Sequence, residues 1–312
     1  MAAVLDPVFE AEAMRFRWLD NWAKLPTPQR GAENQRTHGV AETRDGRLVV
    51  FRQADPAVLF YDRQGRLVNS WGSHFLGAHG LTLANDAGRE VLLLTDQYSG
   101  AVELRDLEGR FIRDYRRPPH AAYASPAAKW SPTWAALAPD GKVWVADGYG
   151  QSLVHRYDRD GAYEKTLDGS EPGALGLFKC PHGIGFNPMG ELVVVDRHNR
   201  RLQIYDTSGN FKRGVSGHFI YPCSVAFSGG KMLVPELTSG VKLVLGETHV
   251  VADLGRHEGI NAIQGWPNLA GSEHVRPGRF ISPHGACFCS GGDIAVVEWV
   301  VGGRVTRLVR EG

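Results

Sequence analysis

Short apolar runs separated by turn-forming residues recur along most of the chain. The clearest stretch, residues 182–215, reads HGIGFN, ELVVVD, RLQIYD and NFKRGV, with PMG, RHNR and TSG between these runs. Short runs rich in valine, isoleucine and aromatic residues, bounded by glycine, proline, asparagine or aspartate, are typical of β-strands. This stretch therefore predicts four short antiparallel strands joined by tight turns.

The same unit recurs six times, at intervals of 41 to 61 residues. Its first strand begins near His38, His79, Thr133, His182, Cys223 and His284, and its second strand ends on Arg52, Asp96, Asp147, Asp196, Glu236 and Glu298. Four-stranded units repeated every ~40–50 residues predict a β-propeller. We therefore expect an all-β protein, a six-bladed β-propeller of the NHL-repeat type with four antiparallel strands per blade.

This pattern also predicts the domain organisation. Residues 31–312 would form one propeller domain, and residues 1–30 a lead-in that helps to close the ring beside the C-terminal strand, which removes a free sheet edge. Two intervals are longer than the others because residues 113–130 and 255–281 are inserted between units. Long loops in compact domains are often functional, but the sequence does not decide the role of these two.

Composition narrows the classes of partner and location. The 312 residues carry a formal net charge of +1, so no broad basic field favours nucleic acid or an anionic membrane. Residues 1–30 show no apolar core of a secretory signal, and no run of about 18 apolar residues predicts a membrane span. The four cysteines form no Cys-x-x-Cys pair. We expect a cytoplasmic protein with reduced thiols and a small-molecule substrate, of undetermined oligomeric state.

Three histidines occupy the same position at the start of alternating units. His79, His182 and His284 each precede a glycine, and alternating blades of a six-fold ring lie about 120° apart, so the three imidazoles would converge on the axis. A single histidine there is usually only hydrogen-bonded in a turn, but three equivalent ones predict a catalytic metal site, with Zn²⁺ first and other divalent transition metals as alternatives. His38 shares this register in the first unit and is interpreted as a substrate-pocket residue, with a fourth histidine ligand or a solvated side chain as alternatives.

Several segments resemble the NHL-repeat propellers and, within them, the peptidyl-α-hydroxyglycine α-amidating lyase family. The segments AHGL (78–81), PHGI (181–184) and PHGA (283–286) resemble the three zinc-binding segments of that family. The resemblance implies a zinc-dependent lyase that cleaves an α-hydroxyglycine amide into an amide and glyoxylate. It further implies that Tyr149 handles the proton, and that Arg197 and Arg52 bind the carboxylate and support the developing charge.

The chain also departs from that family pattern. Gly150 replaces a cysteine after the tyrosine, and Gly285 replaces an aspartate that helps to bind a structural calcium, so we do not expect calcium. Trp134 replaces an aspartate at the start of the third unit, and we predict that it lies at the rim of the substrate pocket. These departures leave the substrate open.

Plainer interpretations stand beside these roles. Tyr149 could merely cover the top of a blade, and Arg197 lies in an arginine-rich run that is commonly a solvated face. Acidic residues at strand ends usually brace the adjoining turn through backbone hydrogen bonds. Glu236 and Glu298 could do the same, but we predict that they point into the substrate pocket.

Three functional hypotheses follow. The first is a metal-dependent lyase similar to the amidating lyase, acting on a C–N or C–O bond of a small polar hydroxylated substrate. The second is another metal-dependent propeller enzyme, such as a lactonase, or a hydratase or epimerase of a hydroxy acid. The third is a non-catalytic NHL interaction module, which would bind no stoichiometric metal. A lyase releases a carbonyl compound, whereas a lactonase releases a proton and a hydroxy acid.

Overall fold

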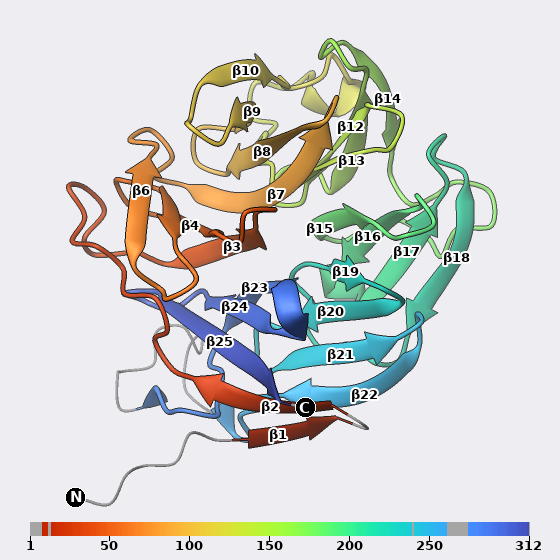
Figure 1. Ribbon diagram of the computed structural model, residues 1–312. Helices are drawn as coiled ribbons and strands as arrows, with labels where there is room; N and C mark the ends of the chain where they lie inside the picture. Colours follow the sequence, from red (N-terminus) through yellow and green to blue (C-terminus); the bar gives the residue numbers. More distant parts are fainter. Residues whose placement is uncertain (1–7, 12–13, 239, 261–273, 312) are drawn as a thin grey trace, which may run out of the picture.

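The strands form six sheets arranged around a central axis (Figure 1). This structure, a computed structural model, describes residues 8–11, 14–238, 240–260 and 274–311. Five sheets have four antiparallel strands and one has five. The predicted all-β, six-bladed propeller is therefore confirmed.

The first three blades follow the order of the chain, with the first strand of each next to the axis. They contain β3 (Thr37–Glu42), β4 (Leu48–Arg52), β5 (Val58–Tyr61) and β6 (Leu67–Trp71); β7 (Ala78–Asp86), β8 (Arg89–Asp96), β9 (Ala101–Asp106) and β10 (Phe111–Asp114); and β11 (Trp134–Leu137), β12 (Val143–Asp147), β13 (Leu153–Tyr157) and β14 (Tyr163–Leu167).

The other three blades complete the ring, and the last takes strands from both ends of the chain. They contain β15 (Pro181–Phe186), β16 (Leu192–Asp196), β17 (Arg201–Tyr205) and β18 (Phe211–Ser216); β19 (Ala226–Ser228), β20 (Lys231–Pro235), β21 (Val241–Leu245) and β22 (His249–Leu254); and β23 (Pro283–Phe288), β24 (Ile294–Glu298), β25 (Arg304–Glu311), β2 (Met14–Leu19) and β1 (Val8–Ala11).

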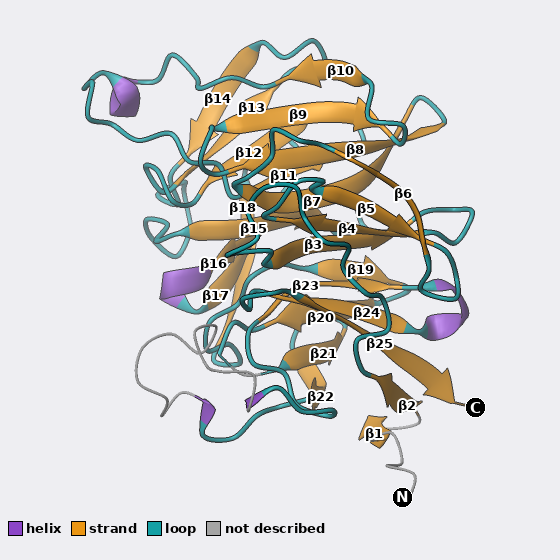
Figure 2. Ribbon diagram, turned by 90° about the vertical axis from the view of Figure 1, so that its left-hand side faces the viewer, coloured by secondary structure: helices purple, strands orange, loops and turns teal. Residues whose placement is uncertain are grey.

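Pairing of the N-terminal strands with β25 joins the two ends of the chain in the sixth blade. Trp18 of β2 pairs with Leu308 of β25, and β1 then adds to the outer edge of β2. The first blade packs against the sixth through β3 and β23, and against the second through β3 and β7. Figure 2 shows these inner strands close together in the middle of the molecule.

The second strand of each blade is sandwiched between neighbouring blades, which explains its continuous apolar sequence. All five residues of β4, β12, β16 and β24 are buried. Side chains from adjacent blades interlock there, as where Phe51 and Phe60 of the first blade pack against Leu92 of the second. Burial on both faces favours such runs over strict alternation.

Antiparallel pairing brings the chemically interesting positions to one face of the disc. The start of each inner strand lies opposite the end of the second strand, as Pro181 lies opposite Asp196 and Pro283 opposite Glu298. The histidine segments and the strand ends therefore share this face. In the described part of the chain, no helix has the length and apolarity needed to cross a bilayer.

Candidate functional site

Three histidine rings meet at the axis, one from each alternating blade. His79, His182 and His284 are buried at the starts of β7, β15 and β23, and their ring centroids are 4.6, 4.8 and 4.9 Å apart. This near-equilateral triangle matches the arrangement that the spacing of the three His-Gly segments predicts.

Each of these rings is fixed by the inner strand of the next blade. Nδ1 of His79 lies 2.7 Å from the carbonyl oxygen of Thr133, Nδ1 of His182 lies 2.7 Å from that of Cys223, and Nδ1 of His284 lies 3.0 Å from that of His38. A carbonyl can only accept, so each Nδ1 carries the proton and each Nε2 keeps a lone pair. Metal-binding histidines are typically held this way by an outer partner.

The glycine after each histidine allows this hydrogen bond to form. A Cβ atom at Gly80 would lie 2.6 Å from the carbonyl oxygen of Thr133, and one at Gly183 would lie 2.5 Å from that of Cys223. These are the same carbonyls that hold the histidine rings. Any larger residue would push the neighbouring strand away, so the His-Gly pair is a single structural unit.

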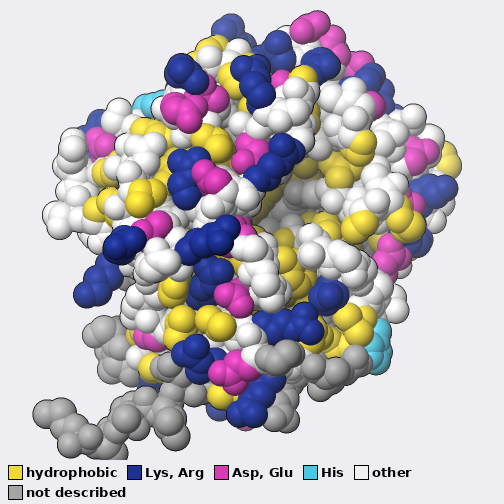
Figure 3. Space-filling model, in the orientation of Figure 1, with side chains coloured by type: hydrophobic (Ala, Val, Ile, Leu, Met, Phe, Trp, Pro, Cys, Tyr) yellow, Lys and Arg dark blue, Asp and Glu magenta, His cyan; other side chains and the backbone are white. Residues whose placement is uncertain are grey.

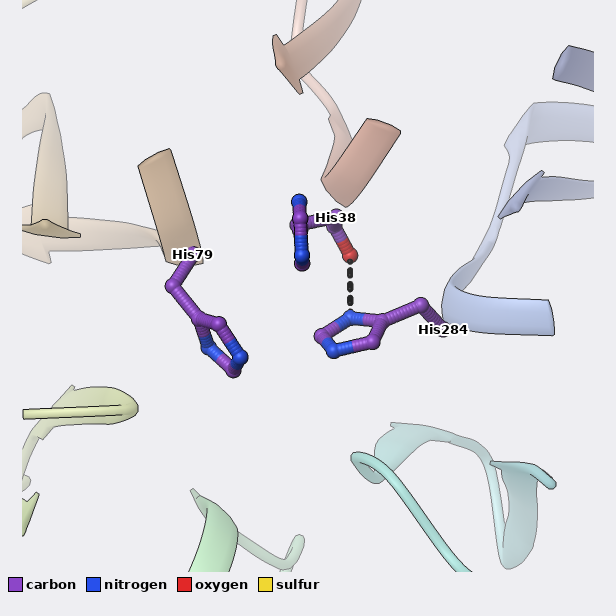
Figure 4. Close-up of side chains that lie close together, drawn as sticks. All are labelled: His38, His79 and His284. Carbon is purple, nitrogen blue, oxygen red and sulfur yellow. Dashed lines mark hydrogen bonds between the residues drawn. The ribbon is translucent and has the colours of Figure 1, made fainter. Parts of the chain in front are cut away.

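His38 lies beside this triangle, at the start of β3. Its ring centroid is 4.9 Å from that of His79 and 4.4 Å from that of His284. Candidate ligand atoms of His38, His79 and His284 all lie within 4.8 Å of one another (Figure 4). A three-histidine cluster is therefore present among the described residues, and it contains His38 in the place that the sequence predicts for His182.

The histidines are suited to a metal because they are neutral. Burial, together with nearby positive charge, lowers the pKa of all four rings, that of His79 to about 3. Neutral imidazole is the form that binds a metal ion. Nε2 of His79 is buried and has no hydrogen-bond partner among the described residues. These features fit a transition-metal ion.

Tyr149 and Arg197 stand next to the triangle, as the resemblance implies. The Tyr149 hydroxyl lies 2.9 Å from Nε2 of His182, and Arg197 donates from Nη1 to that hydroxyl over 3.1 Å. Burial raises the pKa of Tyr149 to about 12, while the Arg197 guanidinium opposes the rise. Arg197 is almost completely buried, so it is not part of a solvated face.

Trp134 lies below the histidines rather than at an open rim. Its indole Nε1 donates to the hydroxyl of Thr82 over 3.1 Å, and its ring is nearly parallel to that of His284 at 6.3 Å. It also lines a cavity of about 300 Å³ that runs along the inner strands. The prediction of a rim position is therefore revised, because the side chain follows the channel away from the strand starts.

Arg52 does not join the cluster. Its Nε donates to the carbonyl of Pro56 and its Nη1 to the carbonyl of Pro26, so it holds the lead-in segment against the first blade. Among the described residues it makes no hydrogen bond to the histidines or to Tyr149. Arg52 therefore braces the lead-in segment, and its catalytic role stays a prediction.

Glu236 and Glu298 also brace turns instead of facing a substrate pocket. Both carboxylate oxygens of Glu236 accept from the backbone N–H of Ile220 at 3.0 Å. Glu298 accepts from the backbone N–H groups of Ile281 and Ser282 and pairs with Arg304. Buried carboxylates need such donors. Glu236 and Glu298 therefore take the turn-bracing role that is also expected of Asp96, Asp147 and Asp196 at the corresponding strand ends.

Three residues near the site, Tyr221, Cys223 and Tyr123, carry no sequence signal that reveals their role. The guanidinium carbon of Arg197 lies 5.1 Å from the ring centroid of Tyr221, and its Nη2 lies 3.1 Å from Sγ of Cys223. In the third blade, the Tyr123 hydroxyl donates to Asp147 over 2.6 Å and lies 2.8 Å from Nε2 of His155. Tyr123 comes from the inserted residues 113–130, so this insertion is docked beside the loop that carries Tyr149.

Sequence comparisons agree with the repeat pattern. The NHL repeat family matches residues 178–205, which include His182 and Arg197. A curated protein of Caenorhabditis elegans, named a probable peptidyl-alpha-hydroxyglycine alpha-amidating lyase, is 26% identical over 151 residues. That match covers 47% of this chain and 42% of the relative, so it spans less than half of either protein. The chain thus contains an NHL repeat and is distantly similar to this lyase.

Structural comparisons support the fold. A streptogramin B lyase structure is matched with a TM-score of 0.65 at 12% identity, over 97% of this chain and all of the other. A gluconolactonase from Xanthomonas campestris is matched with a TM-score of 0.59 at 13% identity, over 99% of both chains. At such low identity these likenesses establish the propeller fold alone.

Proposed function

We propose that this protein is a metal-dependent lyase that cleaves a C–N or C–O bond of a small polar hydroxylated substrate. The proposed reaction resembles the one that the name of its amidating-lyase relative describes. The observation that carries the proposal is the triangle of His79, His182 and His284 with Tyr149 directly against it. Fold similarity alone would not support an activity.

The metal would be held by the Nε2 atoms of His79, His182 and His284, with zinc as the first choice. Their Nδ1 atoms already donate to backbone carbonyls, which leaves each Nε2 as the atom that would bind the ion, with the metal displacing the Tyr149 hydroxyl from Nε2 of His182. A bound divalent ion supplies Lewis acidity, which polarises a substrate oxygen and lowers the pKa of its proton.

The side chains around the histidines would manage the proton and the charge. In an α-hydroxyglycine amide, Tyr149 would take the proton of the hydroxyl group as the C–O bond becomes a carbonyl and the C–N bond breaks. The amide nitrogen then receives a proton, so the products are an amide and glyoxylate without any oxidant. Arg197 would stabilise the phenolate of Tyr149 before it takes the hydroxyl proton and after it passes that proton to the nitrogen, since its guanidinium already donates to that oxygen.

Metal content and product analysis test the proposal together. Elemental mass spectrometry of untagged protein should find about one divalent transition-metal ion per chain, and His79→Ala should hold markedly less of it because one of the ligand nitrogens is gone. His249→Ala, which changes an exposed histidine on β22, serves as the matched control and should keep the metal. Incubation with an N-acyl-α-hydroxyglycine should then release glyoxylate. A protein that holds no metal after reconstitution would contradict the proposal.

A further inference from the structure

The feature that the proposed function does not use is the side chain of His38. It is completely buried, and neither of its ring nitrogens has a hydrogen-bond partner among the described residues. A buried polar group without a partner costs about 1–3 kcal/mol, so such a group calls for an explanation, of which a bound ion is one. The other three axial histidines each have at least one hydrogen bond.

His38 occupies the remaining side of the histidine cluster. The first blade lies between the sixth and the second, so His38 stands between His284 and His79 and across the axis from His182. The distances between ring centroids define two triangles that share the His79–His284 edge. One triangle is completed by His182 and the other by His38, so a metal ion near the shared edge has a nitrogen donor on both sides.

The backbone of His38 is already part of the ligand arrangement. Its carbonyl oxygen accepts the Nδ1–H of His284, as Figure 4 shows. The ring of His38, unlike the other three, makes no hydrogen bond to the next blade in the described part of the chain, so it can turn a nitrogen toward the shared edge without breaking such a bond.

We propose that His38 is a fourth histidine ligand and that one metal ion is bound by His38, His79, His182 and His284. This inference rests on the proposed function only for the presence of a metal, and not for the reaction. Nε2 of His182 accepts from the Tyr149 hydroxyl, so a metal ion on that nitrogen would displace the tyrosine.

Four nitrogen ligands restrict which metal ions could still bind a substrate. Zinc with four protein ligands is normally a closed, tetrahedral, structural site, whereas a catalytic site keeps an open position. Fe²⁺, Mn²⁺, Co²⁺ and Ni²⁺ accept imidazole ligands and expand readily to five or six. A four-histidine site would therefore favour an ion of this class over the zinc that three histidines alone would favour, because such an ion can accept further oxygen ligands.

Cobalt substitution measures the number of ligands directly. Four-coordinate Co²⁺ absorbs strongly in the visible range, whereas five- and six-coordinate Co²⁺ absorbs weakly. The wild-type protein loaded with Co²⁺ should show the weak spectrum, and His38→Ala should show the strong one. His38→Phe fills the same space without a nitrogen and should behave as His38→Ala does. Circular dichroism confirms that the variants fold.

Chelator competition gives a second readout that does not depend on activity. Removal of one ligand should weaken Co²⁺ binding at least about tenfold in His38→Phe. His182→Ala should retain weakened Co²⁺ binding because three histidines remain. The double variant, with both His38→Phe and His182→Ala, should lose nearly all Co²⁺ binding. An unchanged spectrum and affinity in His38→Phe would overturn the proposal, as would a change confined to KM, which marks a substrate contact. Four-ligand binding without glyoxylate release would leave His38 as a ligand and refute only the proposed reaction.

Discussion

The hydroxyl oxygen of Tyr149 lies 2.9 Å from Nε2 of His182. Since Nδ1 of His182 donates to the carbonyl of Cys223, Nε2 is the acceptor and the tyrosine supplies the proton. Tyr149 and a metal ion therefore compete for one lone pair. A metal ion on His182 would displace the Tyr149 hydroxyl and leave it available to a substrate hydroxyl. Metal binding by His182 and proton transfer by Tyr149 would therefore be linked.

Replacement of Tyr149 by phenylalanine separates metal binding from proton transfer. The variant should bind metal at least as tightly as the wild type, because the competing hydroxyl is gone. Its turnover should fall about 100-fold or more, since a positioned general base typically contributes ~10²–10⁴-fold. Chelator competition and a glyoxylate assay measure the two effects. Unchanged turnover would remove Tyr149 from the mechanism.

Arg197→Lys should weaken support for the phenolate while keeping the positive charge nearby. Lysine cannot keep the three separate contacts of Arg197 with Tyr149, the carbonyl of Pro222 and Sγ of Cys223. Because the guanidinium lowers the pKa of Tyr149, that pKa should rise and the ascending limb of the pH–rate profile should move to higher pH. A lower rate with an unshifted profile would mean that Arg197 acts only through packing.

Arg52→Lys distinguishes two roles of Arg52, bracing of the lead-in segment and binding of the substrate carboxylate. The buried guanidinium holds the carbonyls of Pro26 and Pro56, and loss of such bonds should lower the free energy of unfolding by about 1–3 kcal/mol. The KM for a carboxylate substrate should not change. Urea unfolding and steady-state kinetics are the two measurements, and a large rise in KM with normal stability would restore the catalytic role predicted from the sequence.

Tyr123→Phe should loosen the inserted residues 113–130. It removes the hydroxyl that donates to Asp147 and contacts His155, and it leaves a buried carboxylate with one donor fewer. We expect a loss of about 1–3 kcal/mol in unfolding free energy and faster proteolysis of the insertion. Tyr98→Phe, at an exposed tyrosine, is the matched control. Equal proteolysis rates in the two variants would show that the docking contact is weak.

The repeat and the His-Gly segments made the fold and the axial cluster predictable from the sequence. Strand periodicity defines the blades, and equal register in alternating blades places His79, His182 and His284 together. The direction of a side chain at a strand end is not encoded in this pattern. It depends on which backbone groups the neighbouring loops present, and for that reason the sequence does not reveal that Glu236 and Glu298 accept from backbone N–H groups or that Arg52 donates to backbone carbonyls.

His38 and Trp134 show a second limit of sequence patterns. Register places His38 with the other axial histidines, but only the structure reveals that its ring nitrogens have no partner in the described residues. Trp134 follows Thr133 at the start of its blade, and its direction is set by the hydroxyl of Thr82 on the neighbouring strand. Contacts between blades of this kind leave no periodic signal along the chain.

Glu236 should make stability depend on pH. Burial raises the pKa of its carboxyl group to about 7 from 4.5, with opposition from Lys242 and the N–H of Ile220. Because the folded protein holds this proton more tightly than the unfolded chain, the contribution is complete below about pH 4.5 and is lost as the pH rises through 7. At ~1.4 kcal/mol per pH unit, the difference amounts to about 3 kcal/mol.

Glu236→Gln isolates this contribution, because the amide oxygen can still accept from Ile220 but cannot ionise. Urea unfolding between pH 4.5 and 8 should show that the variant gains stability relative to the wild type as the pH rises, since only the wild type must bury a charge there. Glu258→Gln changes an exposed carboxylate and should follow the wild-type curve. If the curves of Glu236→Gln and the wild type run parallel, the Glu236 carboxylate is ionised in the folded protein throughout this range, and its backbone donors outweigh the cost of burial.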